Sequence, residues 1–132
     1  MGFLTLIFAH LFAVVQPCLF PVNGSTGFIS SSGVKYHDRT CTWIITVPSN
    51  HTVKLKFTIF RLSYDSWSQA KIQVHDGKRK TDNVLGVFTG ARQPFIIQTS
   101  GRFMMFTLEK MFSGDPCNFK GTFIGSRKGK RK

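Results

Sequence analysis

Apolar and polar residues alternate at every second position through most of the chain after Cys41, which is the period of a strand with one buried face. The same alternation recurs in CTWIITVP, KIQVHDG, RFMMFTLEKM and NFKGTFIG, with Pro, Gly, Asn and Ser between the runs. No stretch after residue 30 predicts a long amphipathic helix. Many short strands at this spacing indicate an all-β fold, an antiparallel β-sandwich or barrel. In TVKLKFTIF, residues 52–60, the predicted buried positions are Val53, Leu55, Phe57 and Ile59.

The phase of the alternation also assigns individual side chains. Trp43 shares its phase with Ile45 and Val47, so we expect its ring in the core rather than against a ligand. The stretch HDGKRKTDN lies between two apolar runs and is predicted to be a hairpin-like connection. Gly77 is expected to take a positive φ, Asp76 to cap the turn, and His75 to face outward beside it.

The beginning of the chain is an uncharged, almost wholly apolar run from Phe3 to Val15. It is too short to span a bilayer and has the length of a signal-peptide core. We expect a signal peptide at 1–17, with the cut falling anywhere between 13 and 24, one folded domain over 18–125, and a basic, disordered tail over 126–132. No later run is long enough for a membrane anchor, so the mature chain is expected to be secreted.

Two Asn-x-Ser/Thr sequons, at Asn23 and Asn50, fit the secretory route as glycosylation sites. The three cysteines, Cys18, Cys41 and Cys117, are compatible with one disulfide and one odd thiol.

The charge of the chain points to an anionic partner. Eighteen Lys and Arg against six Asp and Glu give a formal net charge of +12. Two short runs concentrate this charge, the predicted connection and the tail, and either run is a solvated segment or part of an anion-binding surface. The anion-binding candidates are Lys78, Arg79, Lys80, Arg127, Lys128, Lys130, Arg131 and Lys132.

Residue patterns that would indicate an enzyme are lacking in the sequence. One Glu and five Asp offer no spacing that pairs two acids for general acid–base work. The histidines of the mature chain, His37, His51 and His75, lie far apart and form no zinc-ligand pattern. There is no Gly-x-Ser-x-Gly elbow and no Gly-rich phosphate loop. We therefore expect a non-enzymatic protein with no cofactor.

Six pieces of the sequence, in order, resemble the elements of a CUB domain, an extracellular β-sandwich module. They are GFISSSGVKYHDRTCTWIITVP, VKLKFTIFRL, IQVHDG, LGVFTG, PFIIQTSGRFMMFTL and FKGTF. The resemblance covers about Cys18 to Phe123 and implies an antiparallel β-sandwich of the CUB-like jelly-roll type.

The resemblance also implies a pairing of the cysteines. Cys41 matches the second cysteine of the family and Cys18 lies where the first would fall, which implies a Cys18–Cys41 disulfide and a signal cut before residue 18. The second bridge of the family is missing, with Thr89 in place of one cysteine. Cys117 lies outside the pattern, and three fates stay open: a free thiol, a disulfide-linked dimer, or a bridge to Cys41 if Cys18 is cleaved off.

Many CUB domains bind calcium through acids at one end of the sandwich. The matching positions here are Ser63, Ala70 and Glu109, of which only the last is an acid. Because calcium prefers carboxylate oxygens, we predict no metal site. The chain is similar to the calcium-free spermadhesins, single secreted CUB domains that bind carbohydrates and proteins.

Two functions follow as hypotheses. The first is a secreted binding module for anionic extracellular partners, such as sulfated glycans or the extracellular matrix. The alternative is a specific protein–protein recognition module, a short form or processing product of a larger multidomain CUB protein. Nucleic-acid binding conflicts with the secretory signal, and no nucleic-acid-binding motif is present.

Overall fold

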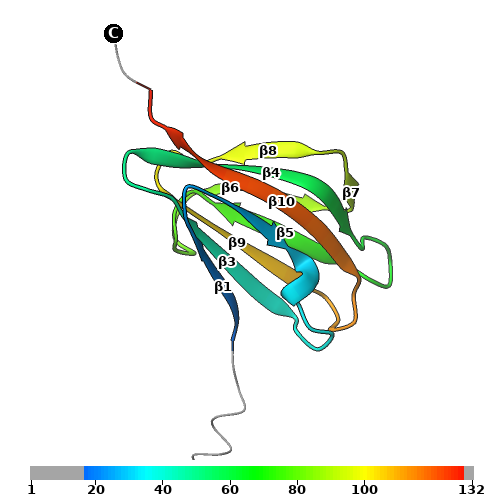
Figure 1. Cartoon of the computed structure of the whole chain (residues 1–132). Helices are drawn as coiled ribbons and strands as arrows, with labels where there is room; N and C mark the ends of the chain where they lie inside the picture. Colours follow the sequence, from blue (N-terminus) through cyan, green and yellow to red (C-terminus); the bar gives the residue numbers. More distant parts are fainter. Residues whose placement is uncertain (1–16, 130–132) are drawn as a thin grey trace, which may run out of the picture.

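The computed structural model describes residues 17–129 as a sandwich of two β-sheets (Figure 1). The first, sheet A, has the strand order β1-β3-β9-β5-β6. These strands are Cys18–Asn23, Thr40–Thr46, Phe103–Lys110, Ala70–His75 and Val84–Thr89. The predicted all-β sandwich is confirmed, whereas the predicted signal peptide falls almost wholly on residues outside the described range.

Sheet B has the order β2-β10-β4-β7, with β8 also pairing with β4. Its strands are Thr26–Ser30, Cys117–Arg127, His51–Leu62, Ala91–Arg92 and Phe95–Gln98. A short 3-10 helix, η1 at Ser31–Gly33, follows β2. All pairings in both sheets are antiparallel except that of β1 with β3, which is parallel. The chain crosses repeatedly between the sheets, so loops from both gather at the two ends of the sandwich.

The core lies between the sheets and is unusually aromatic. Trp43 is buried, as predicted, and its ring stacks on Phe20 at 4.9 Å and on Phe106 at 4.8 Å between centroids. Phe119 meets the same indole edge-on at 5.2 Å. Offset and edge-on pairs of this kind stabilise a core beyond the area they bury.

One predicted phase is wrong. Ile59 was expected in the core beside Phe57, but it is 37% exposed and Phe60 is buried instead. The register explains the change, because Phe57 pairs with Gly121 while Ile59 pairs with Lys120, leaving Thr58 unpaired between them. Such a bulge inserts one residue and reverses which side chains face inward.

The disulfide joins Cys18 of β1 to Cys41 of β3, adjacent in the parallel register of these strands. Cys117 carries a free thiol at the start of β10. The alternative Cys41–Cys117 bridge applies to a chain from which Cys18 is cleaved off, and for that chain it stays a prediction.

The predicted tail begins later than expected. Ser126 and Arg127 belong to β10 and pair with Thr52 and His51, so they extend the sheet instead of forming a disordered segment. The Lys128 amide also donates to the carbonyl of Asn50 at 3.0 Å. The start of the basic tail is thus fixed to the β3–β4 connection.

Candidate functional site: the basic end

Several connections meet at the end of the sandwich from which the C-terminal segment leaves (Figure 1). They are the β1–β2 turn at 24–25, the β3–β4 connection at 47–50, the β5–β6 connection at 76–83, the β8–β9 connection at 99–102, and the end of β10. We call this group of segments the basic end. It brings together the two basic runs that the sequence analysis singled out separately.

The β5–β6 connection is a hairpin loop, as predicted, and its own backbone closes it. The Asp76 amide donates to the carbonyl of Asn83 at 2.7 Å, and the Asp82 amide donates to that of Arg79 at 3.1 Å. Gly77 has a φ of +145°, in the left-handed region, and a Cβ there would collide with the Asp82 carboxylate. The loop that carries Lys78–Lys80 is therefore a defined structure.

Asp76 does not cap its own turn, contrary to the prediction. Its carboxylate accepts hydrogen bonds from the Ser100 amide at 2.9 Å and the Ser100 hydroxyl at 2.8 Å. The contact ties the basic loop to the β8–β9 connection, 24 residues further along the chain. Asp82 is also engaged within the loop, because its carboxylate accepts from the Arg79 amide at 3.0 Å.

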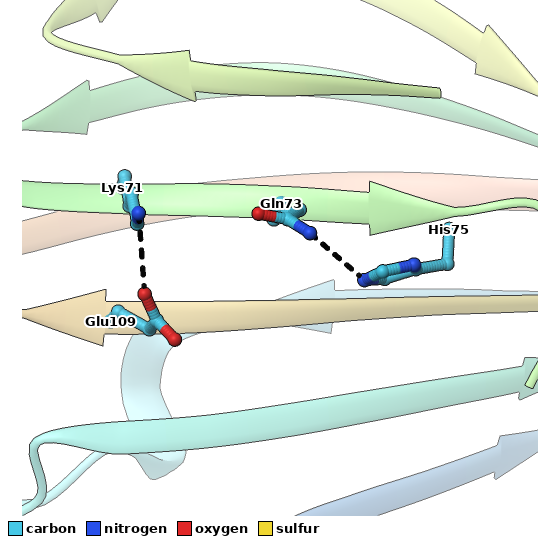
Figure 2. A network of polar contacts seen from close by, with 4 residues as sticks. All are labelled: Lys71, Gln73, His75 and Glu109. Carbon is cyan, nitrogen blue, oxygen red and sulfur yellow. Dashed lines mark hydrogen bonds and ion pairs between the residues drawn. The ribbon is translucent and has the colours of Figure 1, made fainter. Parts of the chain in front are cut away.

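His75 is the second correction near this loop. It lies on the outer side of sheet A but is only 4% exposed. Its Nδ1 lies 3.0 Å from the Asp82 carbonyl and its Nε2 lies 3.3 Å from Nε2 of Gln73 (Figure 2). A neutral ring protonated on Nδ1 satisfies both contacts, since a carbonyl only accepts and the Gln73 amide nitrogen only donates. The imidazole thus supports the loop rather than facing solvent.

Arg102 is a functional candidate that no pattern in the sequence indicates. Its Nε donates to the Val47 carbonyl at 3.0 Å, and its guanidinium lies 5.2 Å from the centroid of the Phe103 ring. The Lys78 ammonium lies over the same ring at 4.6 Å. Two cations therefore share one aromatic ring, which places Arg102 beside the basic loop. No sequence motif marks this residue, because only the pairing of strands brings it here.

The cations of the basic end have no carboxylate partners. Among residues 17–129 the single side-chain ion pair joins Lys71 and Glu109 at 3.5 Å, on the outer side of sheet A (Figure 2). The basic side chains of this end are all exposed: Lys78, Arg79, Lys80, Arg102, Arg127 and Lys128. Unpaired cations gathered at one end produce a positive potential that attracts anions. Lys130, Arg131 and Lys132 lie outside the described residues.

Both sequons lie at the same end. Asn23 is the last residue of β1 and Asn50 lies in the β3–β4 connection, and both side chains are exposed. Asn50 has a φ of 63°, a left-handed conformation that Asn tolerates better than most residues. A glycan on either residue would stand next to the cations. Glycosylation at these sites stays a prediction.

The three positions matched to family calcium ligands lie at the opposite end and do not converge. The Ala70 side chain points into the core opposite Lys110, whereas Glu109 is directed outward to Lys71. The Ser63 hydroxyl is buried with no hydrogen-bond partner. Lys110 itself is 6% exposed, and its ammonium donates to the Ser113 carbonyl.

A buried carboxylate, Asp115, lies in the same region but is saturated by protein donors. It accepts from the Ser68 hydroxyl at 2.8 Å, the Phe112 amide at 2.9 Å and the Gln69 amide at 3.2 Å. Burial by itself would raise the pKa of Asp115, but these hydrogen bonds outweigh it and hold the pKa below the ordinary carboxyl value. Its role is to join the β4–β5 and β9–β10 connections.

The thiols offer no second site. Within the described part of the chain, the one group of three side chains that could approach a common metal ion is Cys18, Asp38 and Cys41, and the disulfide removes both thiols. Burial raises the pKa of the half-buried Cys117 thiol, and the Lys110 ammonium offsets only part of that rise. A thiol held in its protonated form is a weak nucleophile.

Together, the two sheets and their strand order define the fold class of the chain, an extended β-sandwich with loops gathered at its two ends. The sequence profile of the CUB domain matches residues 18–123, and the chain belongs to the CUB domain family. CUB domains are protein–protein interaction modules of extracellular proteins. No helix among residues 17–129 is long and apolar enough to cross a membrane.

Relatives and solved structures agree with this assignment. A bone morphogenetic protein 1 homolog of Strongylocentrotus purpuratus is 33% identical over 91 residues, covering 67% of this chain and 14% of that protein. Homo sapiens cubilin is 32% identical over 88 residues, covering 66% of this chain and 2% of cubilin. The chain thus spans a small part of each of these relatives. The CUB1-EGF-CUB2 domains of rat MASP-1 superimpose with a TM-score of 0.59 at 25% identity, over 81% of this chain and 42% of that one.

Proposed function

We propose that this chain is a secreted, non-enzymatic CUB module whose basic end binds anionic extracellular partners, such as sulfated glycans or the extracellular matrix. One observation carries the proposal. Lys78–Lys80 and Arg127–Lys128, almost fifty residues apart in the sequence, lie at the same end of the sandwich as Arg102, and none of these cations pairs with a carboxylate. A sulfated glycan suits such a cluster, because each exposed cation can pair with a separate sulfate group of the same glycan chain.

The shape of the basic end supports a binding role over that of a solvated loop. Backbone closure of the hairpin and the Asp76–Ser100 contact fix the backbone positions from which the loop cations project before any partner arrives. Preorganisation lowers the entropy lost on binding. The acids of this end, Asp76 and Asp82, accept from backbone and hydroxyl donors and form no ion pair with the cations, and because the cations outnumber these two carboxylates the end stays net positive.

Retention of the secreted chain on a heparin matrix tests the proposal. We expect elution well above physiological salt, and elution at a lower salt concentration for the double variant Lys78→Gln/Arg79→Gln, because screened contacts are lost. The matched control is Lys35→Gln/Arg61→Gln, which removes the same charge at the opposite end. If both variants elute together, net charge rather than the basic end is responsible. If the wild type elutes at physiological salt, the proposal is wrong.

A second candidate function, recognition of a specific protein, is favoured by the opposite end. Tyr36, Tyr64, Trp67 and Phe112 are 79%, 63%, 84% and 56% exposed there, on three different connections. Aromatic side chains of this kind are enriched where proteins bind one another. Cell-surface binding that resists high salt and is lost in Trp67→Ser, while Lys78→Gln/Arg79→Gln retains it, would select this function.

Two further parts of the proposal concern metal binding and the free cysteine. We propose that there is no calcium site, a proposal supported by the buried Lys110 ammonium and by the protein donors that already occupy the Asp115 carboxylate. We also propose a monomer with a free Cys117, in place of a disulfide-linked dimer, because the thiol is half-buried and protonated. Intact mass of the secreted chain, with thiol alkylation, reports the signal cut, the tail and this thiol.

A further inference from the structure

The outer side of sheet B combines exposed apolar side chains with lysines. Residues on β2, β10, β4 and β8 alternate, so that every second side chain leaves the core. We define the mixed face by three apolar and three basic side chains that point outward from these strands: Phe28, Lys54, Lys56, Ile96, Lys120 and Ile124. Phe28 is 81% exposed, Ile96 54% and Ile124 46%.

The strand register interleaves the two kinds of side chain. One row across the sheet runs Phe28, Thr122, Lys56 and Ile96, and the next runs Thr26, Ile124, Lys54 and Gln98. Each row crosses three inter-strand spacings of about 4.8 Å, or roughly 14 Å in all. Within its row each of these lysines therefore has an apolar neighbour on one side, Ile96 for Lys56 and Ile124 for Lys54, and a polar neighbour on the other.

No acid neutralises these lysines. All six Asp and Glu of the chain lie elsewhere, five in connections or at their edges and Glu109 on sheet A. The outer side of sheet A differs, because there Lys71 pairs with Glu109 and the neutral Gln73–His75 contact lies beside them (Figure 2). The two faces of the sandwich thus differ in charge.

The chemistry of the mixed face distinguishes between partners. Protein interfaces gather apolar groups at the centre, with polar groups at the rim, and are depleted in lysine. Here Lys56 lies in the middle of a row between Phe28 and Ile96. A sulfated glycan would pair with the lysines but gain little from Phe28, Ile96 and Ile124. Lysines with long apolar stems among exposed apolar side chains suit the boundary between anionic headgroups and acyl chains.

We infer that the mixed face docks on the surface of a membrane that contains anionic phospholipid. The lysines contact headgroup phosphates, while Phe28, Ile96 and Ile124 enter the boundary with the acyl chains. The inference does not depend on the proposed function, because it concerns a different surface from the basic end. Nor does it require a spanning segment, since the face lies on the membrane as a peripheral contact.

Co-sedimentation of the secreted chain with vesicles tests the inference. Two compositions are used at physiological salt: phosphatidylcholine alone, and phosphatidylcholine with phosphatidylserine in a two-to-one ratio. We expect binding to the anionic vesicles only. Lys54→Gln/Lys56→Gln should weaken that binding about 25-fold, because each lysine near an anionic surface contributes about fivefold to the affinity. Phe28→Ser/Ile124→Ser should weaken it at least about tenfold, through loss of apolar burial.

Matched controls separate the face from general effects. Lys35→Gln/Lys71→Gln removes the same charge from other surfaces, and Val84→Ser/Val87→Ser removes exposed apolar side chains of β6. Both should bind anionic vesicles as the wild type does, and all variants should keep the wild-type melting temperature within a few degrees, because every substituted side chain is exposed.

Four results would overturn the inference. The wild type fails to bind anionic vesicles, or Phe28→Ser/Ile124→Ser binds them unchanged, or its control Val84→Ser/Val87→Ser loses binding equally. The fourth is that poly-glutamate or heparin binds the wild type but does not bind Phe28→Ser/Ile124→Ser. That result would assign the face to a soluble acidic partner. In all four cases the proposed function is tested separately: if heparin retention depends only on Lys78 and Arg79, anion binding by the basic end is supported whatever the vesicles show.

Discussion

Substitution of Asp115 tests whether its carboxylate holds the β4–β5 and β9–β10 connections together at the end of the sandwich opposite to the basic end. Its carboxylate is the common acceptor for donors from two connections, Ser68 and Gln69 on one and Phe112 on the other. In Asp115→Asn, the amide oxygen still accepts from both backbone amides, and the amide nitrogen donates to the Ser68 hydroxyl after that hydroxyl rotates. The substitution therefore removes the charge while keeping the shape and the contacts.

The expected loss follows from the strength of hydrogen bonds to charged groups. Such bonds contribute about 1.5–3 kcal/mol each, against about 0.5–1.5 kcal/mol for neutral ones. Three bonds each weakened by about 1 kcal/mol give a loss of roughly 2–3 kcal/mol in the free energy of unfolding. Asp115→Ala should lose more, roughly 4 kcal/mol, because the two amides of Gln69 and Phe112 then lack a partner.

Urea denaturation followed by fluorescence measures both losses, with Asp65→Asn as the control. Asp65 also accepts two amide hydrogen bonds, from Trp67 and Ser68, but it is exposed, so its loss should stay below about 1 kcal/mol. A loss for Asp115→Asn no greater than that of the control would refute the account of this end.

The pH dependence supplies a second check on Asp115. Its folded-state pKa is lowered, so its stabilising contribution is fully present above the unfolded-state pKa and is lost as the pH falls through the folded-state pKa. The stability difference between wild type and Asp115→Asn should therefore be constant near neutral pH and shrink below about pH 4. A difference that persists unchanged to the lowest pH at which both variants fold would contradict the lowered pKa.

Three further predictions concern the loop and the cysteines. Replacing Cys18 and Cys41 with Ser should lower the free energy of unfolding by about 3 kcal/mol, as expected for a loop of sequence separation 23, and unchanged urea midpoints would argue against it. Gly77→Ala should lose at least 1–2 kcal/mol, roughly, because its φ is +145° and the new Cβ meets Asp82, whereas Gly101→Ala, with open space, should change little. Alkylation of Cys117 at mildly alkaline pH should be slow in the folded chain and fast in urea; equal rates would show an accessible thiolate.

Much of the fold could be predicted from the alternation of apolar residues. Val53, Leu55 and Phe57 are fully buried because a strand with period two places them on one face, and Trp43 follows the same rule. Ile59 departs from it because the bulge opposite Lys120 and Gly121 depends on strand pairing. The alternation within β4 does not show that Thr58 has no pairing residue in β10.

The candidate site was predictable only in part. The basic runs are visible in the sequence, but their meeting depends on β10 pairing with the start of β4 and on the position of the β5–β6 hairpin. Arg102 is placed in the site by its contacts with Val47 and Phe103, and no sequence motif predicts these contacts. His75 was expected to face outward, and its burial arises from the Asp82 carbonyl and Gln73, both placed by the hairpin.

Anion binding at the basic end can be measured residue by residue, by titrating the isotope-labelled chain with a short sulfated oligosaccharide and following the amides by NMR. We expect the largest chemical-shift changes at residues 76–83, at Arg102 and its neighbours, and at Arg127 and Lys128, and we expect added salt to reverse them. Changes centred on the opposite end, at 63–69 and 111–116, or changes that salt does not reverse, would contradict the assignment of anion binding to the basic end.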